Sequence, residues 1–279
     1  MSENWVVNNL ESAIGSWNNR LAEMWEIITQ SPAEFKDGAI WSVMVGISST
    51  MQGIGYGLLV LFFAMGICQS AASFRDLQRP EFALRYFIRF VGAKVAVGYA
   101  MDLMVAIYNI CGGIVQSVMD GIGSSVEETA SLPDELVTAI EGLGLLESIP
   151  LWLVSFLGSL VITVLSFVLI LTVYGRFFKL YLFTALAPLP LSTFAGENVS
   201  STGKAFLKAY VGVGMEGAVI VLACLIYSAF ISGGVSDLDT ALPAVTMAWK
   251  YLSELIFNML ILSGLIRGSE RVVREMLGL

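Results

Sequence analysis

The sequence contains no histidine, and this absence removes several classes of enzyme at once. Zinc sites built on imidazole, Ser-His catalysis and haem ligation by histidine all need a histidine side chain. The sequence also has no Gly-x-x-x-x-Gly-Lys-Ser/Thr run that would bind the phosphates of a nucleotide. We therefore predict a chain that is not an enzyme and that has no cofactor and no metal site.

Charged residues are scarce, at 14% of the 279 residues, while hydrophobic residues make up 56%. Soluble domains contain roughly 45–50% apolar residues, and the mean hydropathy here is +0.77. No basic segment followed by an apolar one opens the chain, so no cleavable signal peptide is expected. Cys68, Cys111 and Cys224 all fall in apolar runs, which favours small buried side chains over disulfides. The composition predicts an all-α, polytopic membrane protein.

Uncharged runs long enough for a helix of about 20 residues predict five transmembrane crossings. An approach helix at 39–50 precedes the first crossing. Residues 38–279 then form a transmembrane domain, and residues 1–37 form an extracytoplasmic amphipathic helical segment. The predicted crossings are about 51–71, 90–119, 149–174, 210–232 and 243–266.

A sixth apolar segment, 180–196, carries Pro188 and Pro190 near its middle. A proline inside a helix costs about 3 kcal/mol or more. Basic residues lie on both sides, Lys179 before the segment and Lys204 after it. A re-entrant hairpin that faces the protein interior keeps both flanks on the cytoplasmic side. The alternative is a proline-kinked full crossing, which would leave the C-terminus outside.

The loops differ in charge, and this asymmetry predicts the orientation of the chain. The loop between the second and third crossings carries acidic charges and no basic ones, so it is expected outside. The loop between the first two crossings is basic and is expected in the cytoplasm, with the N-terminus outside and the C-terminus inside. Its arginines are candidates for contacts with anionic lipid headgroups: Arg75, Arg79, Arg85 and Arg89.

The N-terminal segment has large apolar residues at helical spacing. Six of them form one stripe of a predicted helix: Leu10, Ile14, Trp17, Leu21, Met24 and Ile28. Such a stripe needs a covering surface, which is a second copy, the outer leaflet, or the extracytoplasmic loops of the same chain. Four residues are the candidate contacts between copies: Trp17, Leu21, Met24 and Ile28.

Three acidic residues, Asp102, Glu216 and Glu254, lie inside predicted crossings. A charge in a membrane span is costly and faces a cavity or a partner charge, so all three are candidates for a polar interior. For Glu216 and Glu254 we favour pairing with a lysine, such as Lys250 one turn before Glu254. Asp102 has no basic residue within a turn and is the better candidate to line a water-filled path.

The order of features from residue 150 onward resembles a known family. A long apolar helix is followed by RFFKLYLFTALAPLPLSTFAG, by the polar turn ENVSSTGKAF and by a second long helix. This is similar to the TrbL-type inner-membrane subunits of type IV secretion and conjugal transfer machines. The resemblance covers about 150–232 by motif and the whole chain by the order of its crossings. The residues that carry the motif are Arg176, Ala187, Pro188 and Pro190.

The resemblance implies a non-enzymatic channel or platform subunit in the cytoplasmic (inner) membrane of a bacterium. It implies a homo-oligomer, five-fold by the resemblance, that works with separate ATPases and a pilus or stalk subunit. DNA–protein substrate or pilin would be the material moved, and DNA is the alternative partner of the four arginines. A secondary transporter or another membrane scaffold is the alternative function. Against a transporter stand the lack of an internal repeat and the single proline-broken segment.

Overall fold

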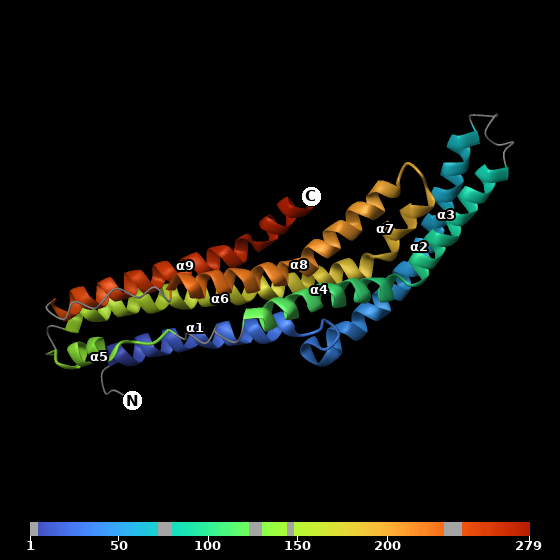
Figure 1. The fold of residues 1–279 in the computed structure, drawn as a ribbon. Coiled ribbons are helices and arrows are strands. Elements are labelled where there is room, and N and C mark those ends of the chain that lie inside the picture. The colour runs from blue at the N-terminus through green and yellow to red at the C-terminus, as the bar shows by residue number, and fades with distance from the viewer. Residues whose placement is uncertain (1–4, 72–79, 123–129, 144–147, 232–241) are drawn as a thin grey trace. The chain divides into compact units, whose positions relative to one another are not determined.

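The computed structural model describes residues 5–71, 80–122, 130–143, 148–231 and 242–279, and every regular element within them is a helix (Figure 1). This confirms the all-α class. The elements are α1 (Trp5–Thr29), the 3-10 helix η1 (Phe35–Gly38), α2 (Ala39–Ala71), α3 (Pro80–Gly98), α4 (Ala100–Ile122), α5 (Asp134–Glu141), α6 (Ser148–Leu186), α7 (Pro188–Ser192), the 3-10 helix η2 (Thr193–Ala195), α8 (Ser200–Ile231) and α9 (Ala244–Leu277).

Five of these helices are long and apolar enough to cross a membrane, as predicted: α2, α4, α6, α8 and α9. The bounds of the helices differ from the prediction at several places, because α6 runs on to Leu186, α8 begins at Ser200 and α9 runs on to Leu277. The approach helix and the first crossing are one continuous helix, α2. The predicted crossing 90–119 is wrong at its start, because α3 ends at Gly98 and α4 begins at Ala100.

The break between α3 and α4 has a local physical cause. The side-chain amide of Gln52 on α2 donates hydrogen bonds to the carbonyl oxygens of Val97, at 3.3 Å, and Gly98, at 2.7 Å. Helix ends leave carbonyl groups without intrahelical partners, and a side-chain donor can satisfy them. A Cβ on Gly98 would lie 3.0 Å from the hydroxyl of Tyr56. The amide of Gln52 therefore stabilises the interruption, and the hydroxyl of Tyr56 leaves little room for a side chain at position 98.

The chain divides into two compact units by its internal contacts. The first unit comprises residues 1–29, 117–174 and 219–269. The second comprises residues 30–116, 175–218 and 270–279. The predicted division at residue 37 concerns placement relative to the membrane and stays a prediction.

In the first unit, α1 lies along the beginning of α6. Trp5 stacks on Trp152, with ring centroids 5.8 Å apart, and Asn9 donates a hydrogen bond to the hydroxyl of Ser159 at 3.0 Å. The predicted amphipathic helix is present, and most of its stripe is covered by the same chain: Leu10, Ile14, Trp17, Met24 and Ile28 are buried.

This burial bears on the candidate contacts between copies. Trp17, Met24 and Ile28 are each at most 2% exposed within a single chain, and Leu21 is half-buried. In the structure this stripe is therefore covered by other parts of the same chain, as one of the three predicted alternatives proposed. Association between copies stays a prediction.

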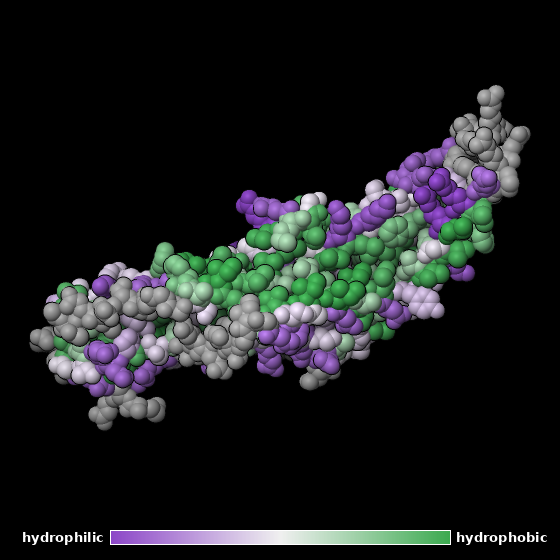
Figure 2. Space-filling view, in the orientation of Figure 1, coloured by the Kyte–Doolittle hydropathy of each residue, from purple (hydrophilic) through white to green (hydrophobic). Residues whose placement is uncertain are grey.

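In the second unit, the short helix α7 packs against α2 and α3. A Cβ on Gly55 of α2 would lie 2.9 Å from the carbonyl oxygen of Pro188, so this helix contact needs a glycine. Figure 2 shows apolar side chains over much of the visible face and polar ones gathered toward α3 and the start of α8. The core of this unit consists of Leu59, Ala93, Val97, Ala100, Met104, Tyr108, Leu180, Ala187, Leu191, Ala195, Tyr210 and Val213.

The proline-broken segment is interrupted where the sequence predicted, at Ala187. Pro188 opens α7, in a first turn where a missing N–H costs little. The start of the segment differs, because residues 175–186 continue α6 and no turn separates them from the preceding crossing. The chain reverses after η2, where the N–H of Gly203 donates to the hydroxyl of Thr193 at 3.0 Å. Re-entry of this hairpin into the bilayer stays a prediction.

The cysteines only partly follow the prediction. Cys111 and Cys224 are buried, whereas Cys68 is exposed on α2. The apolar run around Cys68 therefore does not show which face of α2 is covered by the rest of the protein.

Candidate functional site

Arg176 lies in the last third of α6 and is only 2% exposed. Its Nε donates a hydrogen bond to the carbonyl oxygen of Val213, and its Nη2 donates one to that of Gly214, each at 3.2 Å. Within the described part of the chain, Nη1 has no hydrogen-bond partner. A buried charge costs several kcal/mol unless it is paired and hydrogen-bonded. Arg176 is thus a candidate functional residue and not a loop residue before the hairpin.

A glycine in α8 makes room for this guanidinium. A Cβ on Gly217 would lie 2.7 Å from both Nη1 and Nη2 of Arg176. A Cβ on Gly214 would lie 2.8 Å from the sulfur of Cys111 on α4. A side chain at position 217 would displace the guanidinium of Arg176, and one at position 214 would displace Cys111, so Gly217 is the residue that makes room for the buried arginine.

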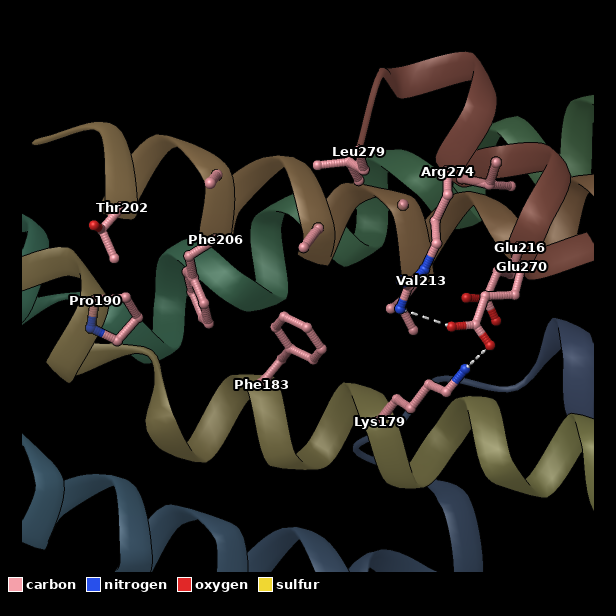
Figure 3. A pocket seen from close by; sticks show the side chains of 14 residues that line it. Lys179, Phe183, Pro190, Thr202, Phe206, Val213, Glu216, Glu270, Arg274 and Leu279 are labelled. Carbon is pink, nitrogen blue, oxygen red and sulfur yellow. Dashed lines mark hydrogen bonds and ion pairs between the residues drawn. The ribbon is translucent and has the colours of Figure 1, made fainter.

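Beside this arginine, residues from α6 to α9 line a cavity of about 490 Å³, drawn in Figure 3. Its two ends differ in character. One end is apolar and is formed by Phe183, Pro190 and Phe206. The other end is charged and is formed by Lys179, Glu216, Glu270 and Arg274.

Glu270 is the centre of the charged end. Its carboxylate accepts a hydrogen bond from Lys179 on α6 and forms an ion pair with Arg274 on the same helix at 2.9 Å (Figure 3). The side chains of all three residues are more than a third exposed. Exposed ion pairs are worth about 0–1 kcal/mol, so this cluster sets the charge of the cavity more than the stability of the fold.

Glu216 is different, because it lines the same cavity while being only 6% exposed. No residue in the described part of the chain donates a hydrogen bond to its carboxylate or forms an ion pair with it within 4.0 Å. The predicted pairing with a lysine is therefore not formed. Glu216 is the candidate polar-interior residue that the structure places inside the protein.

The other two acidic candidates lie elsewhere. Asp102 is in the first turn of α4 and is exposed, not central in a crossing, because the helix breaks before it. Within a single chain Asp102 is not covered by protein, and its place in a polar interior stays a prediction. Glu254 is half-buried on α9 and belongs to the first unit.

The predicted basic surface is only partly described. Arg75 and Arg79 lie outside the described residues. Arg85 is exposed on α3. Arg89 forms an ion pair with Glu197 at 3.1 Å, and Tyr86 also donates to that carboxylate at 3.2 Å. Arg89 therefore ties α3 to the turn before α8.

The geometry of this site suits binding. Across the described residues, no group of three or more histidine, cysteine, aspartate or glutamate side chains is placed to hold a metal ion.

Sequence reasoning missed Lys179, Glu270 and Arg274 as one cluster. The spacing of Glu270 and Arg274, one helical turn apart, was a signal for their pair. Nothing in the sequence signalled that Lys179, far away in the chain, joins them.

Comparison with models of known protein families gives a match. A family model described as TrbL/VirB6 plasmid conjugal transfer like protein matches residues 17–188, which is more than half of the chain. The matched region runs from α1 to the first residue of α7 and includes Arg176. No curated protein and no solved structure matches the chain.

Proposed function

Since this chain belongs to the TrbL/VirB6 plasmid conjugal transfer like family, we propose that it is a non-enzymatic channel or platform subunit of a type IV secretion machine. It is a membrane component of conjugal transfer and a multi-pass bacterial membrane protein. The proposal adds that it resides in the cytoplasmic membrane and assists the passage of DNA–protein substrate or the assembly of a pilus.

The family match over residues 17–188 is the observation that carries this proposal. The five long apolar helices support it, since a channel or platform subunit must be held within the bilayer. The charged groups near the cavity are arranged as a salt-bridge cluster and a buried guanidinium. Such groups can bind a ligand and hold it in position. The energy for transport would come from separate ATPases.

The proposed partners follow from the same family. They are further copies of this chain, in a five-fold ring, together with a pilus or stalk subunit and the transfer ATPases. Since Trp17, Met24 and Ile28 are buried in their own chain, contacts between copies would use other surfaces. Asp102, which is exposed, can line a polar path only if a neighbouring copy or another subunit covers it.

The test is a mating assay with a strain that lacks this gene. Loss of transfer, restored by the wild-type gene in trans, is the expected result, with nicking of the transferred DNA unchanged as the control. Co-purification of the chain with a transfer ATPase would separate a machine subunit from a secondary transporter. Wild-type transfer frequency in the deletion strain would overturn the proposal.

A single variant tests the polar path separately. Asp102→Asn removes one exposed charge without changing the size of the side chain, so the protein is expected to insert normally. Lower transfer with normal membrane levels would support a path lined by Asp102. Unchanged transfer would remove Asp102 from it.

A further inference from the structure

The cavity beside α8 has the two-part character of a site for an amphiphile. Its volume of about 490 Å³ lies within the range of roughly 300–1,000 Å³ that is typical of small-molecule sites. Phe183 and Phe206 pack on each other at its apolar part, with ring centroids 5.4 Å apart. The charged part begins one helical turn before Phe183, at Lys179. A ligand that fills it needs both an apolar chain and a charged head.

The carboxylate of Glu216 indicates which headgroup chemistry the cavity would accept. It is 94% buried and lines the cavity, and in the described residues it receives no hydrogen bond. A buried charge without a hydrogen-bonded partner is strongly unfavourable. An acceptor of this kind is satisfied by a ligand with N–H groups and a positive charge, which is the chemistry of a protonated amine.

The cations at the same charged end of the cavity add a second requirement. Lys179 and Arg274 share the single carboxylate of Glu270. An ammonium group has three N–H donors and a guanidinium has five, so both side chains keep donors for another acceptor. A phosphate is the acceptor that such cations bind well. The lining therefore offers both cations and a carboxylate to a ligand that carries one charge of each sign.

We propose that this pocket binds a phospholipid with a primary amine in its headgroup, phosphatidylethanolamine. The ammonium group donates to Glu216, the phosphate lies against Lys179 and Arg274, and an acyl chain follows Phe183 and Phe206. A choline headgroup has the same net charge but no N–H to donate, so it leaves Glu216 unsatisfied. A glycerol headgroup is anionic overall and brings no positive charge to Glu216. The site is therefore selective within the phospholipids.

The experiment compares lipids that differ only in the headgroup. The full chain, purified and delipidated in mild detergent, is incubated with equal amounts of phosphatidylethanolamine, phosphatidylcholine and phosphatidylglycerol that carry identical acyl chains. Native mass spectrometry then counts the bound molecules of each. We expect at least tenfold more bound phosphatidylethanolamine than either of the others. Equal occupancy by the three lipids would overturn the proposal.

Two variants place the selectivity at this pocket. Glu216→Gln is nearly isosteric and is expected to abolish the preference for the amine. Glu275→Gln removes the same charge from an exposed position of α9 outside the pocket and is expected to keep the preference. A preference that survives Glu216→Gln would contradict the proposal.

Ala209→Phe fills the cavity from α8 and is expected to reduce binding of all three lipids. A circular dichroism spectrum and a size-exclusion profile like those of the wild type show that this variant is folded. Undiminished binding by the folded variant would place the lipid elsewhere. These measurements do not depend on DNA transfer, so their outcome is separate from that of the mating assay.

Discussion

The guanidinium of Arg176 on α6 is hydrogen-bonded to the carbonyl oxygen of Val213 on α8, with 3.2 Å between Nε and the oxygen. The acceptor is a backbone atom, so the bond does not depend on which side chain stands at position 213. The requirement therefore falls on the arginine and on the small residue that admits it, Gly217. This dependence leads to two substitutions, one of the arginine and one of a glycine, that are both expected to destabilise the protein.

Arg176→Lys keeps the charge but loses the planar fork that reaches two carbonyl oxygens. Hydrogen bonds to a charged group are worth about 1.5–3 kcal/mol each, so we expect the free energy of unfolding to fall by about 3 kcal/mol. The melting temperature in detergent is the measurement. Arg271→Lys, the same change at an exposed position of α9, should cost less than about 0.5 kcal/mol. Equal melting temperatures for both variants would show that the buried hydrogen bonds carry no stability.

Gly217→Ala should destabilise the protein, because the new methyl group would lie 2.7 Å from the guanidinium of Arg176. Forcing extra atoms into a packed interior costs about 1–3 kcal/mol. Gly112→Ala on α4 is the matched control, since a Cβ there meets no atom of the described residues within 4 Å. Alanine in a helix is favoured over glycine by up to about 1 kcal/mol, so this variant should melt slightly higher. The melting temperatures of the two variants are the measurement. A Gly217→Ala variant that melts at the wild-type temperature would contradict the close packing of Gly217 against Arg176.

The contact between α2 and α7 gives a second matched pair, two residues apart in one helix. A Cβ on Gly55 would lie 2.9 Å from the backbone carbonyl oxygen of Pro188, whereas one on Gly53 meets nothing within 4 Å in the described residues. Backbone atoms cannot move aside as a side chain can, so Gly55→Ala should lower the free energy of unfolding by about 1–3 kcal/mol. Gly53→Ala should leave it unchanged or raise it. Chemical unfolding in detergent checks the order of the two variants, and the reverse order would refute the contact.

The orientation of the chain stays a prediction that reporter fusions can test. Fusions after Glu135 and after Asp239 are expected to report an extracytoplasmic position, and a fusion at Leu279 a cytoplasmic one, because basic residues gather in the other loops. An enzyme active only outside the cytoplasm, paired with one active only inside, gives opposite readings at each site. A Leu279 fusion active only outside the cell would favour a proline-kinked crossing over a re-entrant hairpin.

The crossings could be predicted from the sequence because their signal is local. A run of apolar residues long enough for the bilayer marks a helix whatever it packs against, and all five were found in this way. The break before Ala100 could not be predicted, since it depends on the amide of Gln52, which arrives from α2. Hydropathy along the chain contains no information about that donor.

The site residues show the same limit. The resemblance pointed to Arg176, but its charge suggested the end of a crossing, and α6 instead continues to Leu186. Burial of a charge becomes visible only when the acceptors on α8 and the glycine that admits it are known. For Asp102 the sequence suggested a central place in a crossing, whereas the helix is interrupted three residues earlier.

The length of α2 has a mechanical consequence for the membrane. Its 33 residues span about 50 Å at 1.5 Å per residue, against a hydrocarbon thickness of about 30 Å. To lie wholly within the hydrocarbon, α2 would have to tilt by about 53°, outside the observed range of roughly 0–40°. At a tilt of 40° about seven residues still project, and none of the residues of α2 is charged. The projecting turns must therefore lie in the headgroup region, against neighbouring protein or in a locally thicker bilayer, so the tilt of α2 is coupled to the thickness of the membrane.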